Sequence, residues 1–250
     1  MKKYKALMLD LDGTTIPNKK DGEPSKKVIE AIAKASKVVK IGIATARPHF
    51  MISYILDILD LSSPLIINSG AEIIDCKTRS TLYEQTMEKK DILPICSLLN
   101  SLKVPFLIHD FHKDLSFAND YIPQKPSNIF IPDLTHFFAD TLTKRIGDIP
   151  TITIHKIPSW SKGKVDLLIS HASATKQHAI LKVAEILKIK THEIIGVGDG
   201  YNDFPLLMAC GMKVAMGNAV PELKEIADYI APSVDEDGVA HVINKFILNS

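Results

Sequence analysis

Short apolar runs alternate with helical patterns at both ends of the chain. The runs cover residues 5–9, 38–44, 65–67, 194–197 and 214–216, and loop residues and then a helical pattern follow each of them. Apolar residues also recur three and four positions apart over 50–59 and 180–187, which is typical of helices that bury one face. This order predicts an α/β fold, with a doubly wound parallel sheet covered by helices on both faces.

The middle of the chain has a different character. Only Gly147 and Gly163 of the 12 glycines lie within 81–170, whereas most of the aromatic residues do. The pattern there predicts helices over about 89–103 and 135–146, and strands near 104–108, 151–157 and 165–169. We therefore expect a core formed by 1–80 and 171–250, with a smaller α/β domain, 81–170, inserted into it.

Composition narrows the class of protein. The 250 residues carry a net charge of +1, with 46% hydrophobic and 24% charged residues, which excludes a disordered chain and gives no reason to expect nucleic acid as a partner. No apolar run reaches the roughly 18 residues of a membrane span. The three cysteines form no C-x-x-C pair, so neither a disulfide framework nor a zinc site is indicated. We expect a cytoplasmic protein that does not contact a membrane.

A first acidic cluster directly follows the apolar run 5–9. It contains Asp10, Asp12, Gly13 and Thr14, at the carboxyl edge of the predicted sheet, where ligands bind in open α/β folds. Side chains two positions apart in an extended segment point the same way, so Asp10 and Asp12 can face one site, and Gly13 permits a sharp turn after them. Taken alone, the same pattern is also typical of a solvated turn.

A second acidic cluster, 198–203, follows the apolar run 194–197. Its Asn202 or Asp203 would also suit a helix N-cap, although Gly198 and Gly200 give more loop freedom than a cap requires. If the two clusters meet on neighbouring strand ends, their carboxylates repel by about 4 kcal/mol per pair at 4 Å and an effective dielectric of 20. A cation must then lie between them, and these hard oxygen donors favour Mg²⁺.

Two further positions suit an anion site. Thr45 ends the second predicted strand with a hydroxyl and a backbone N–H, and Arg47 follows it; a threonine that simply ends a strand is the alternative. Lys176 lies in the first turn of a predicted helix, where the helix dipole disfavours a cation unless a phosphate is bound nearby. An exposed lysine is the alternative there.

Together these segments resemble the four motifs of the haloacid dehalogenase (HAD) superfamily, in their order and spacing. The matching segments are 10–14, 45–47, Lys176 and 198–203, and the resemblance spans nearly the whole chain. The insertion 81–170 resembles the C2-type (IIB) α/β cap of the Cof-like phosphatases. The resemblance implies a Rossmann-like core with an inserted cap.

The resemblance also implies roles for the acidic clusters and their partners. Asp10 would be the nucleophile and Asp12 the general acid and base, while Thr45 and Lys176 would hold the phosphoryl oxygens. Mg²⁺ would be bound by Asp10, the Asp12 carbonyl and Asp199. Asp203 would complete the metal site and, with Asn202, support the metal waters and the lysine.

Substrate contacts are implied for Gly13, Thr14, Ala46, Arg47, Ser69, Gly70 and Asn202. Two of the matching segments and the separate loop 68–71 depart from the family pattern. Ala46 stands where the group usually has glycine, Thr175 and Gln177 flank the motif lysine in place of serine and glycine, and Ser69 replaces an asparagine.

The combined interpretation is a Mg²⁺-dependent phosphomonoesterase that works through an aspartyl-phosphate. Its substrate would be a small phosphorylated metabolite, a sugar phosphate by family analogy, and the protein a monomer or small homo-oligomer. A phosphomutase shares the intermediate and is one alternative. A phospho-accepting receiver is another, but it would have no reason to carry the insertion 81–170.

Three residues of the insertion invite other interpretations. His109 and His112 surround Asp110, yet without a third strong ligand they favour a substrate contact from the cap over a metal pair. Trp160 lies beside a lysine-rich segment, and with a single aromatic residue there we expect a solvated loop and no nucleic-acid patch.

Overall fold

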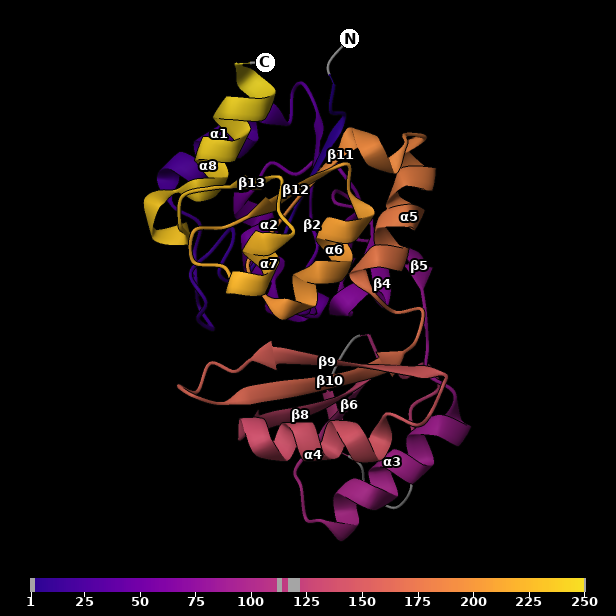
Figure 1. Ribbon diagram of the computed structural model, residues 1–250. Coiled ribbons are helices and arrows are strands. Elements are labelled where there is room, and N and C mark those ends of the chain that lie inside the picture. Colours follow the sequence, from indigo (N-terminus) through magenta and orange to yellow (C-terminus); the bar gives the residue numbers. More distant parts are fainter. Residues whose placement is uncertain (1–2, 112–113, 117–121, 250) are drawn as a thin grey trace.

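The chain folds into two lobes that face each other (Figure 1). The computed structural model describes residues 3–111, 114–116 and 122–249. The core lobe contains both chain ends, which lie on the side away from the other lobe, and the insert lobe is formed by the middle of the chain. Among the described residues, no helix is long and apolar enough to cross a membrane.

A five-stranded parallel sheet forms the centre of the core lobe. Its order is β13-β12-β11-β1-β2, and Leu9 pairs with Ile43 on one side and Val197 on the other. All four residues of β1 are buried, as expected for a central strand covered on both faces. The strands are β1 (Ala6–Leu9), β2 (Lys40–Ile43), β11 (Ile194–Gly198), β12 (Met212–Ala215) and β13 (Tyr229–Ile230).

Helices cover this sheet. In α1, Val28, Ala31, Ile32 and Ala35 are buried at helical spacing, and Ser25 caps the N-terminus by accepting from the backbone N–H of Val28. Helices α1 and α8 pack together, as do α5 and α6 (Figure 1). The predicted doubly wound core with a smaller α/β lobe is therefore confirmed. The helices are α1 (Lys26–Ala35), α2 (Ser53–Ile58), α5 (Lys176–Leu187), α6 (Phe204–Ala209), α7 (Pro221–Glu225) and α8 (Gly238–Ile243).

The run 65–67 behaves differently from the expectation of a plain parallel strand. It forms β3 (Leu65–Ile67), which touches the parallel sheet through one bridge between Ala44 and Ile66 and then pairs antiparallel with β4 (Glu72–Ile74). Strand β5 (Thr81–Glu84) pairs with β4 in turn. The reversal arises because Asn68, Ser69 and Gly70 have φ values of 50°, 55° and 103°.

The insert lobe is an antiparallel sheet with two helices on one face. The strand order is β7-β6-β8-β10-β9, and Figure 1 shows α3 and α4 on the face turned away from the core lobe. The elements are α3 (Lys89–Ser101), β6 (Leu107–His109), β7 (Asp114–Ser116), β8 (Asn128–Leu134), α4 (His136–Ile146), β9 (Ile152–Pro158) and β10 (Val165–His171).

Two strands of the insert lobe differ from the sequence prediction. The strand predicted over 104–108 starts only at Leu107, because Lys103 is left-handed, with φ 55°, and Pro105 follows. Strand β8 was not predicted because Pro132 and the left-handed Asp133, φ 56°, interrupt its pattern. Its pairing with β10 shifts register between Val165 and Leu167.

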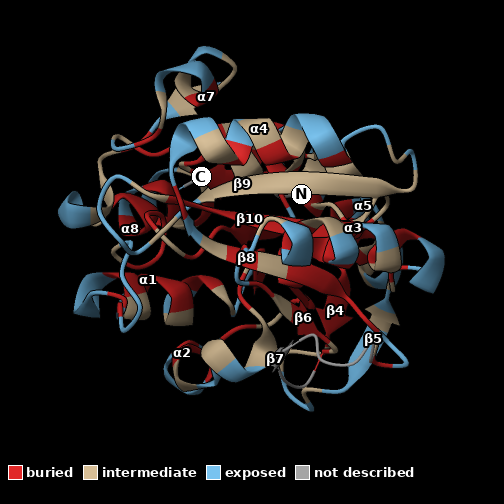
Figure 2. Cartoon of the chain, turned by 90° about the horizontal axis from the view of Figure 1, so that it is seen from below, coloured by how far each residue is buried: buried red, intermediate tan, exposed pale blue. Residues whose placement is uncertain are grey.

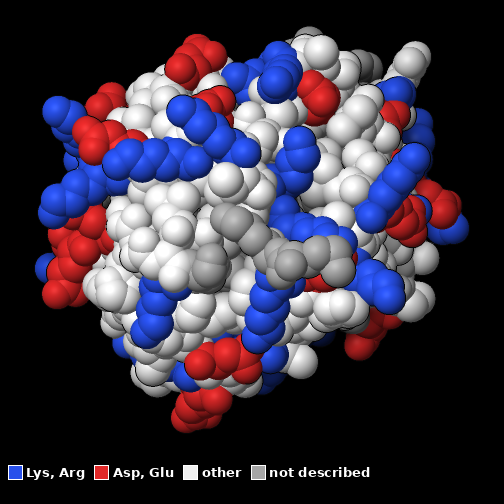
Figure 3. Space-filling view, turned by 90° about the horizontal axis from the view of Figure 1, so that it is seen from above, with Lys and Arg blue, Asp and Glu red and all other residues white. Residues whose placement is uncertain are grey.

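Apolar side chains form two large clusters, one in each lobe. The core-lobe cluster draws on residues 4–74 and 179–247, and the insert-lobe cluster on Met87 to Ile169. Figure 2 shows buried residues along the sheets and exposed ones on the outer helix faces. On the face that carries both chain ends, basic and acidic side chains are interspersed (Figure 3), in keeping with the near-zero net charge.

Candidate active site

The two acidic clusters meet at the carboxyl edge of the parallel sheet. Asp10 follows β1 and Asp199 follows β11, and these two strands are hydrogen-bonded neighbours. The backbone N–H of Asp10 donates to the carbonyl of Val197 at 2.9 Å. Oxygen atoms of Asp10, Asp199 and Asp203 all lie within 4.8 Å of one another. The predicted convergence of carboxylates therefore occurs in the structure.

Lys176 lies at the centre of this cluster. Its Nζ donates to Asp10 Oδ1 at 2.5 Å and to Asp203 Oδ1 at 2.6 Å, and the side chain is only 1% exposed. Burial alone would lower the pKa of Lys176, but the two carboxylates raise it above its ordinary value. The alternative of an exposed lysine is wrong, because the first turn of α5 directs this amine inward.

Asp203 is fully engaged by donors. Besides Lys176, it accepts from the backbone N–H groups of Asp199 and Gly200 at 2.9 and 3.0 Å through Oδ2. It therefore ties the loop 198–203 to Lys176. Both of its oxygens are already hydrogen-bonded, so the structure gives it a supporting position behind Asp10 and Asp199.

The surroundings of the other two carboxylates, Asp10 and Asp199, disfavour their charged forms. Burial, followed by repulsion from Asp203, raises the pKa of Asp10 well above its usual range, although Lys176 opposes the shift. The same two causes raise the pKa of Asp199 to about 7, against a hydrogen bond from Thr14 Oγ1 at 2.8 Å. One ammonium does not balance three clustered carboxylates, so the donor set fits an additional hard cation such as Mg²⁺.

Gly13 makes the close approach of the two clusters possible. Its φ of +80° is left-handed, and a Cβ there would lie 2.2 Å from Asp199 Oδ2. Asn218 Nδ2 donates to the Gly13 carbonyl at 2.8 Å and fixes this turn. Gly13 and Thr14 therefore shape the site from behind and do not line the cavity described below.

Asp12 is held by Arg47. The guanidinium forms a bidentate pair with it, Nε to Oδ2 at 2.8 Å and Nη2 to Oδ1 at 2.5 Å. Arg47 is 5% exposed and also donates to the carbonyls of Lys19 and Lys20, both at 2.9 Å. Burial alone would lower its pKa, but Asp12 raises it. The predicted substrate-binding arginine thus orients Asp12 in this structure.

Thr45 and Ala46 lie beside this pair and line the cavity, as does Asn202. The Thr45 hydroxyl accepts from the backbone N–H of Arg47 at 3.1 Å, and its own N–H donates to Ile66 at 2.8 Å. Thr45 therefore both ends the strand, as the alternative interpretation expected, and lines the cavity.

Ser69 and Gly70 are placed differently from the expected substrate contacts. Both are buried and neither lines the cavity, whereas Asn68 does. At Gly70 a Cβ would lie 2.3 Å from the carbonyl oxygen of Thr175. This loop therefore supports the start of α5, and so the placement of Lys176. The sequence did not predict the left-handed backbone of residues 68–70 that causes this arrangement.

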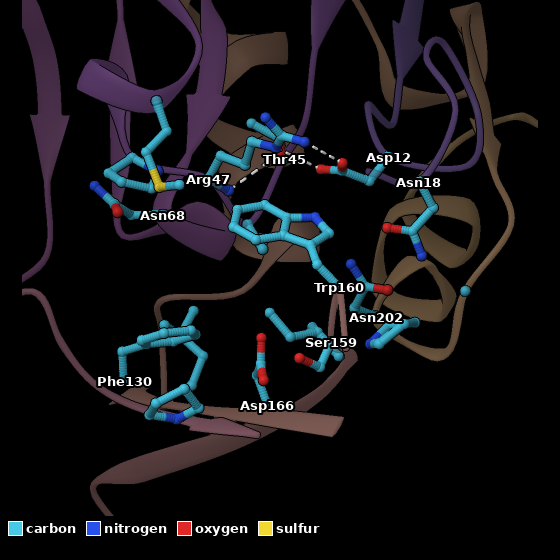
Figure 4. A pocket seen from close by; sticks show the side chains of 18 of the residues that line it. Asp12, Asn18, Thr45, Arg47, Asn68, Phe130, Ser159, Trp160, Asp166 and Asn202 are labelled. Carbon is cyan, nitrogen blue, oxygen red and sulfur yellow. Dashed lines mark hydrogen bonds and ion pairs between the residues drawn. The ribbon is translucent and has the colours of Figure 1, made fainter. Parts of the chain in front are cut away.

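A cavity of about 310 Å³ lies between the lobes, with the acidic cluster at its core-lobe end. Figure 4 shows its walls: Asp12, Thr45 and Arg47 on the core lobe, and Phe130, Ser159 and Asp166 on the insert lobe. Lys176 is not among the lining residues and contacts the site through Asp10.

Trp160 is a functional candidate that the sequence analysis missed. It lies in an exposed loop, as expected, but its ring also lines the cavity and lies over Arg47, with the guanidinium carbon 5.1 Å from the ring centroid. It remains 44% exposed. The one feature of the sequence that could have indicated a role for this residue is that it is the single tryptophan of the chain.

His109 also lines the cavity, and its ring lies 5.5 Å from that of Phe50. This position agrees with the expected contact from the insert lobe. His112 lies outside the described residues. Within those described, the acidic cluster around Asp10 is the one group of three metal-ligating side chains.

Known proteins share both the sequence pattern and the architecture. The family profile of the haloacid dehalogenase-like hydrolases matches residues 7–144 and 118–243. The putative phosphatase YxeH of Bacillus subtilis is 28% identical over 98% of this chain and 99% of its own length. The 5-amino-6-(5-phospho-D-ribitylamino)uracil phosphatase YwtE of the same organism is 27% identical, covering 97% and 98%.

Solved structures agree on the fold. BT1666, a HAD phosphatase of Bacteroides thetaiotaomicron, superimposes with a TM-score of 0.82 at 20% identity, covering 97% of this chain and 95% of that one. The HAD subclass IIB sugar phosphatase BT4131 superimposes with a TM-score of 0.80 at 24% identity, covering 97% and 98%.

The chain belongs to the haloacid dehalogenase-like hydrolase family. The predicted resemblance to the Cof-like phosphatases of this superfamily is confirmed, and with it the class of enzyme, a phosphatase.

Proposed function

We propose that this phosphatase hydrolyses phosphomonoesters of small metabolites, sugar phosphates in particular, with Mg²⁺ and through an aspartyl-phosphate. The observation that carries the proposal is the buried Asp10–Lys176–Asp203 network beside Asp199, at the end of a cavity of metabolite size. The structural neighbour BT4131 is a sugar phosphatase, which supports the substrate class.

Asp10 is the proposed nucleophile. Lys176 holds one of its oxygens, which leaves the other to attack phosphorus in line and form an acyl phosphate as the ester oxygen departs. The Lys176 ammonium, together with the Thr45 hydroxyl, would also offset charge on the phosphoryl oxygens. Bound Mg²⁺, held by Asp10, the Asp12 carbonyl and Asp199, would supply further charge stabilisation there.

Asp12 is the proposed general acid and base. It protonates the departing ester oxygen in the first step and takes a proton from water in the second, which releases phosphate and regenerates Asp10. Arg47 holds its carboxylate in a fixed orientation at the cavity wall. We assign Asp203 and Asn202 to the support of the metal waters and of Lys176.

We also propose that the insertion predicted over 81–170 is the cap, taken from about 87 because β5 (Thr81–Glu84) pairs with β4 of the core lobe, and that 1–80 and 171–250 together with β5 are the catalytic core. The insert-lobe apolar cluster, which lies entirely within 81–170, supports this division. The cytoplasmic location and the monomeric or small homo-oligomeric state expected from the sequence stay predictions.

The test is a phosphate-release screen over phosphorylated metabolites, with Mg²⁺ present and after chelation. We expect multiple turnovers with sugar phosphates, only when Mg²⁺ is present. Release that needs a bisphosphate would indicate a phosphomutase. A single turnover at most would indicate a phospho-accepting module.

A further inference from the structure

The insert-lobe wall of the cavity carries two carboxylates. Asp166, on β10, is 8% exposed, and its Oδ1 accepts from the backbone N–H of Asp133 at 2.8 Å. Asp133 accepts in turn from Ser159 Oγ at 2.8 Å. Figure 4 shows Asp166 and Ser159 on the opposite side of the Trp160 ring from Asp12. This wall is therefore acidic at the place that a leaving group would occupy.

The buried carboxylate is incompletely compensated. Burial raises the pKa of Asp166, and hydrogen bonds from the Asp133 backbone N–H and from Ser159 oppose this only in part. A hydroxyl or ammonium group on a ligand would stabilise it, because hydrogen bonds to charged groups are the strong ones. A second anion on the ligand would be repelled.

The cation that lines this cavity is already paired. Arg47, the one Lys or Arg among the described lining residues, forms its bidentate bond with Asp12 and donates to two backbone carbonyls. It therefore has little capacity to neutralise an anionic leaving group. Trp160 and Phe130 also line the cavity and add flat apolar surface to it (Figure 4), the kind of surface on which the C–H face of a sugar ring packs.

We infer that Asp166 and Trp160 select phosphomonoesters whose leaving group is a hydroxyl-bearing ring without a second anion, either uncharged or amino-substituted. Asp166 accepts from a ring hydroxyl or ammonium, and Trp160 covers the ring face. This inference rests on the proposed function and specifies the substrate class of that site.

The test compares three esters that present the same primary phosphate: glucose 6-phosphate, glucosamine 6-phosphate and 6-phosphogluconate. In the wild type we expect kcat/KM for the first two to exceed that for 6-phosphogluconate by about 100-fold. In Asp166→Asn, which keeps the acceptor for the Asp133 N–H, this ratio should fall to about tenfold. Asp140→Asn, on the outer helix α4 and outside the cavity lining, is the control and should keep the wild-type ratio.

Trp160 is tested separately. Trp160→Ala should raise KM for glucose 6-phosphate about tenfold, while Trp160→Phe, which keeps a flat face, stays within about threefold of the wild type. If Asp166→Asn does not fold, Asp133→Asn replaces it, since asparagine tolerates the left-handed backbone at this position. It should lower the ester ratio about threefold.

The inference and the proposed function fail in different ways. An unchanged ester ratio in the carboxylate variants, with sugar esters still hydrolysed, overturns the inference alone. A wild type that prefers 6-phosphogluconate does the same. Absence of phosphate release from every ester, p-nitrophenyl phosphate included, overturns the proposed function and the inference with it.

Discussion

At the scale of single residues, the site is organised by a lysine that has almost no contact with solvent. Lys176 lies between Asp10 and Asp203 at 2.5 and 2.6 Å. A buried ammonium is stable only when it is paired, so the lysine and the carboxylates hold each other in place. Because these side chains depend on each other, the proposed roles are best tested by substitutions that keep the shape of the side chain, such as aspartate to asparagine.

Asp10→Asn should lower turnover more than 100-fold while the protein stays folded, because the amide has the carboxylate's shape but cannot form an acyl phosphate. Phosphate release and circular dichroism measure the two effects. Asp60→Asn, at an exposed position of the core lobe, is the control. Turnover above a hundredth of the wild-type rate would exclude Asp10 as the nucleophile.

Asp12→Asn should separate substrates by their leaving groups. Hydrolysis of alkyl phosphates should fall further than that of p-nitrophenyl phosphate, because an aryl oxide departs with little help from an acid. Pre-steady-state rates of the first step check this for both ester types. Equal losses would mean that Asp12 is not the acid.

Asp199 links metal binding to stability. Its pKa is about 7 in the folded protein without metal and about 3.9 for a free aspartate, so between these pH values the folded state holds a proton that the unfolded state has lost. The free energy of unfolding therefore falls as the pH rises through this window. Asp199→Asn should flatten that fall and raise the Tm of the metal-free protein near pH 7.

The same Asp199→Asn change should weaken activation by Mg²⁺, because it removes a proposed ligand charge. Thermal melts from pH 4 to 8 in chelator, together with Mg²⁺ titrations of activity, measure both effects. A variant with wild-type Mg²⁺ dependence would place the metal elsewhere.

At the scale of elements, tight turns bring the motif loops together. Gly13 and Gly163 share a left-handed backbone, with φ of +80° and +74°, but a Cβ would meet Asp199 at 2.2 Å in the first case and nothing within 4 Å in the second. Comparing an alanine substitution at each glycine therefore distinguishes the effect of backbone strain from the effect of crowding against Asp199.

Gly163→Ala should lose about 1 kcal/mol of stability from backbone strain alone. Gly13→Ala should lose more, about 3 kcal/mol, and should also weaken Mg²⁺ activation, because Asp199 must move. Denaturant unfolding and Mg²⁺ titration of both variants measure this. Equal stability losses and unchanged Mg²⁺ activation would show that the turn has no role in placing Asp199.

At the scale of the whole molecule, the cavity exists only because two lobes face each other. The chain crosses between them near residues 85–87 and 171–174, where Gln85 N–H donates to Ala71 and Ala172 N–H donates to Thr151. The motif residues lie in the core lobe and the acidic, aromatic wall lies in the insert lobe. We therefore propose that phosphoryl chemistry and choice of leaving group belong to different lobes.

Replacement of residues 87–171 by a short Gly/Ser linker should leave slow, Mg²⁺-dependent hydrolysis of p-nitrophenyl phosphate and reduce the differences among sugar phosphates to within about threefold. These junctions keep β5 paired with β4. Circular dichroism verifies folding, and kcat/KM over a sugar phosphate panel gives the ranking. A folded core that kept the wild-type ranking would place specificity in the core lobe.

The sequence by itself determined the core fold and the set of motif residues. The parallel strands are short buried runs, whose pattern is local, and Asp10 and Asp199 come directly after two of them. Strand direction then places both at one edge of the sheet. For the same reason, the helix that begins at Lys176 could be read from its own apolar spacing.

Only the tertiary structure decided which partners these residues have. The pairing of Arg47 with Asp12, the burial of Lys176 between two carboxylates and the stacking of Trp160 on Arg47 all join segments far apart in the chain. Strand β8 was equally invisible, because Pro132 breaks its local pattern while its pairing with β6 and β10 stabilises it. Long-range contacts of this kind depend on how the lobes pack, which no local pattern of apolar and polar residues specifies.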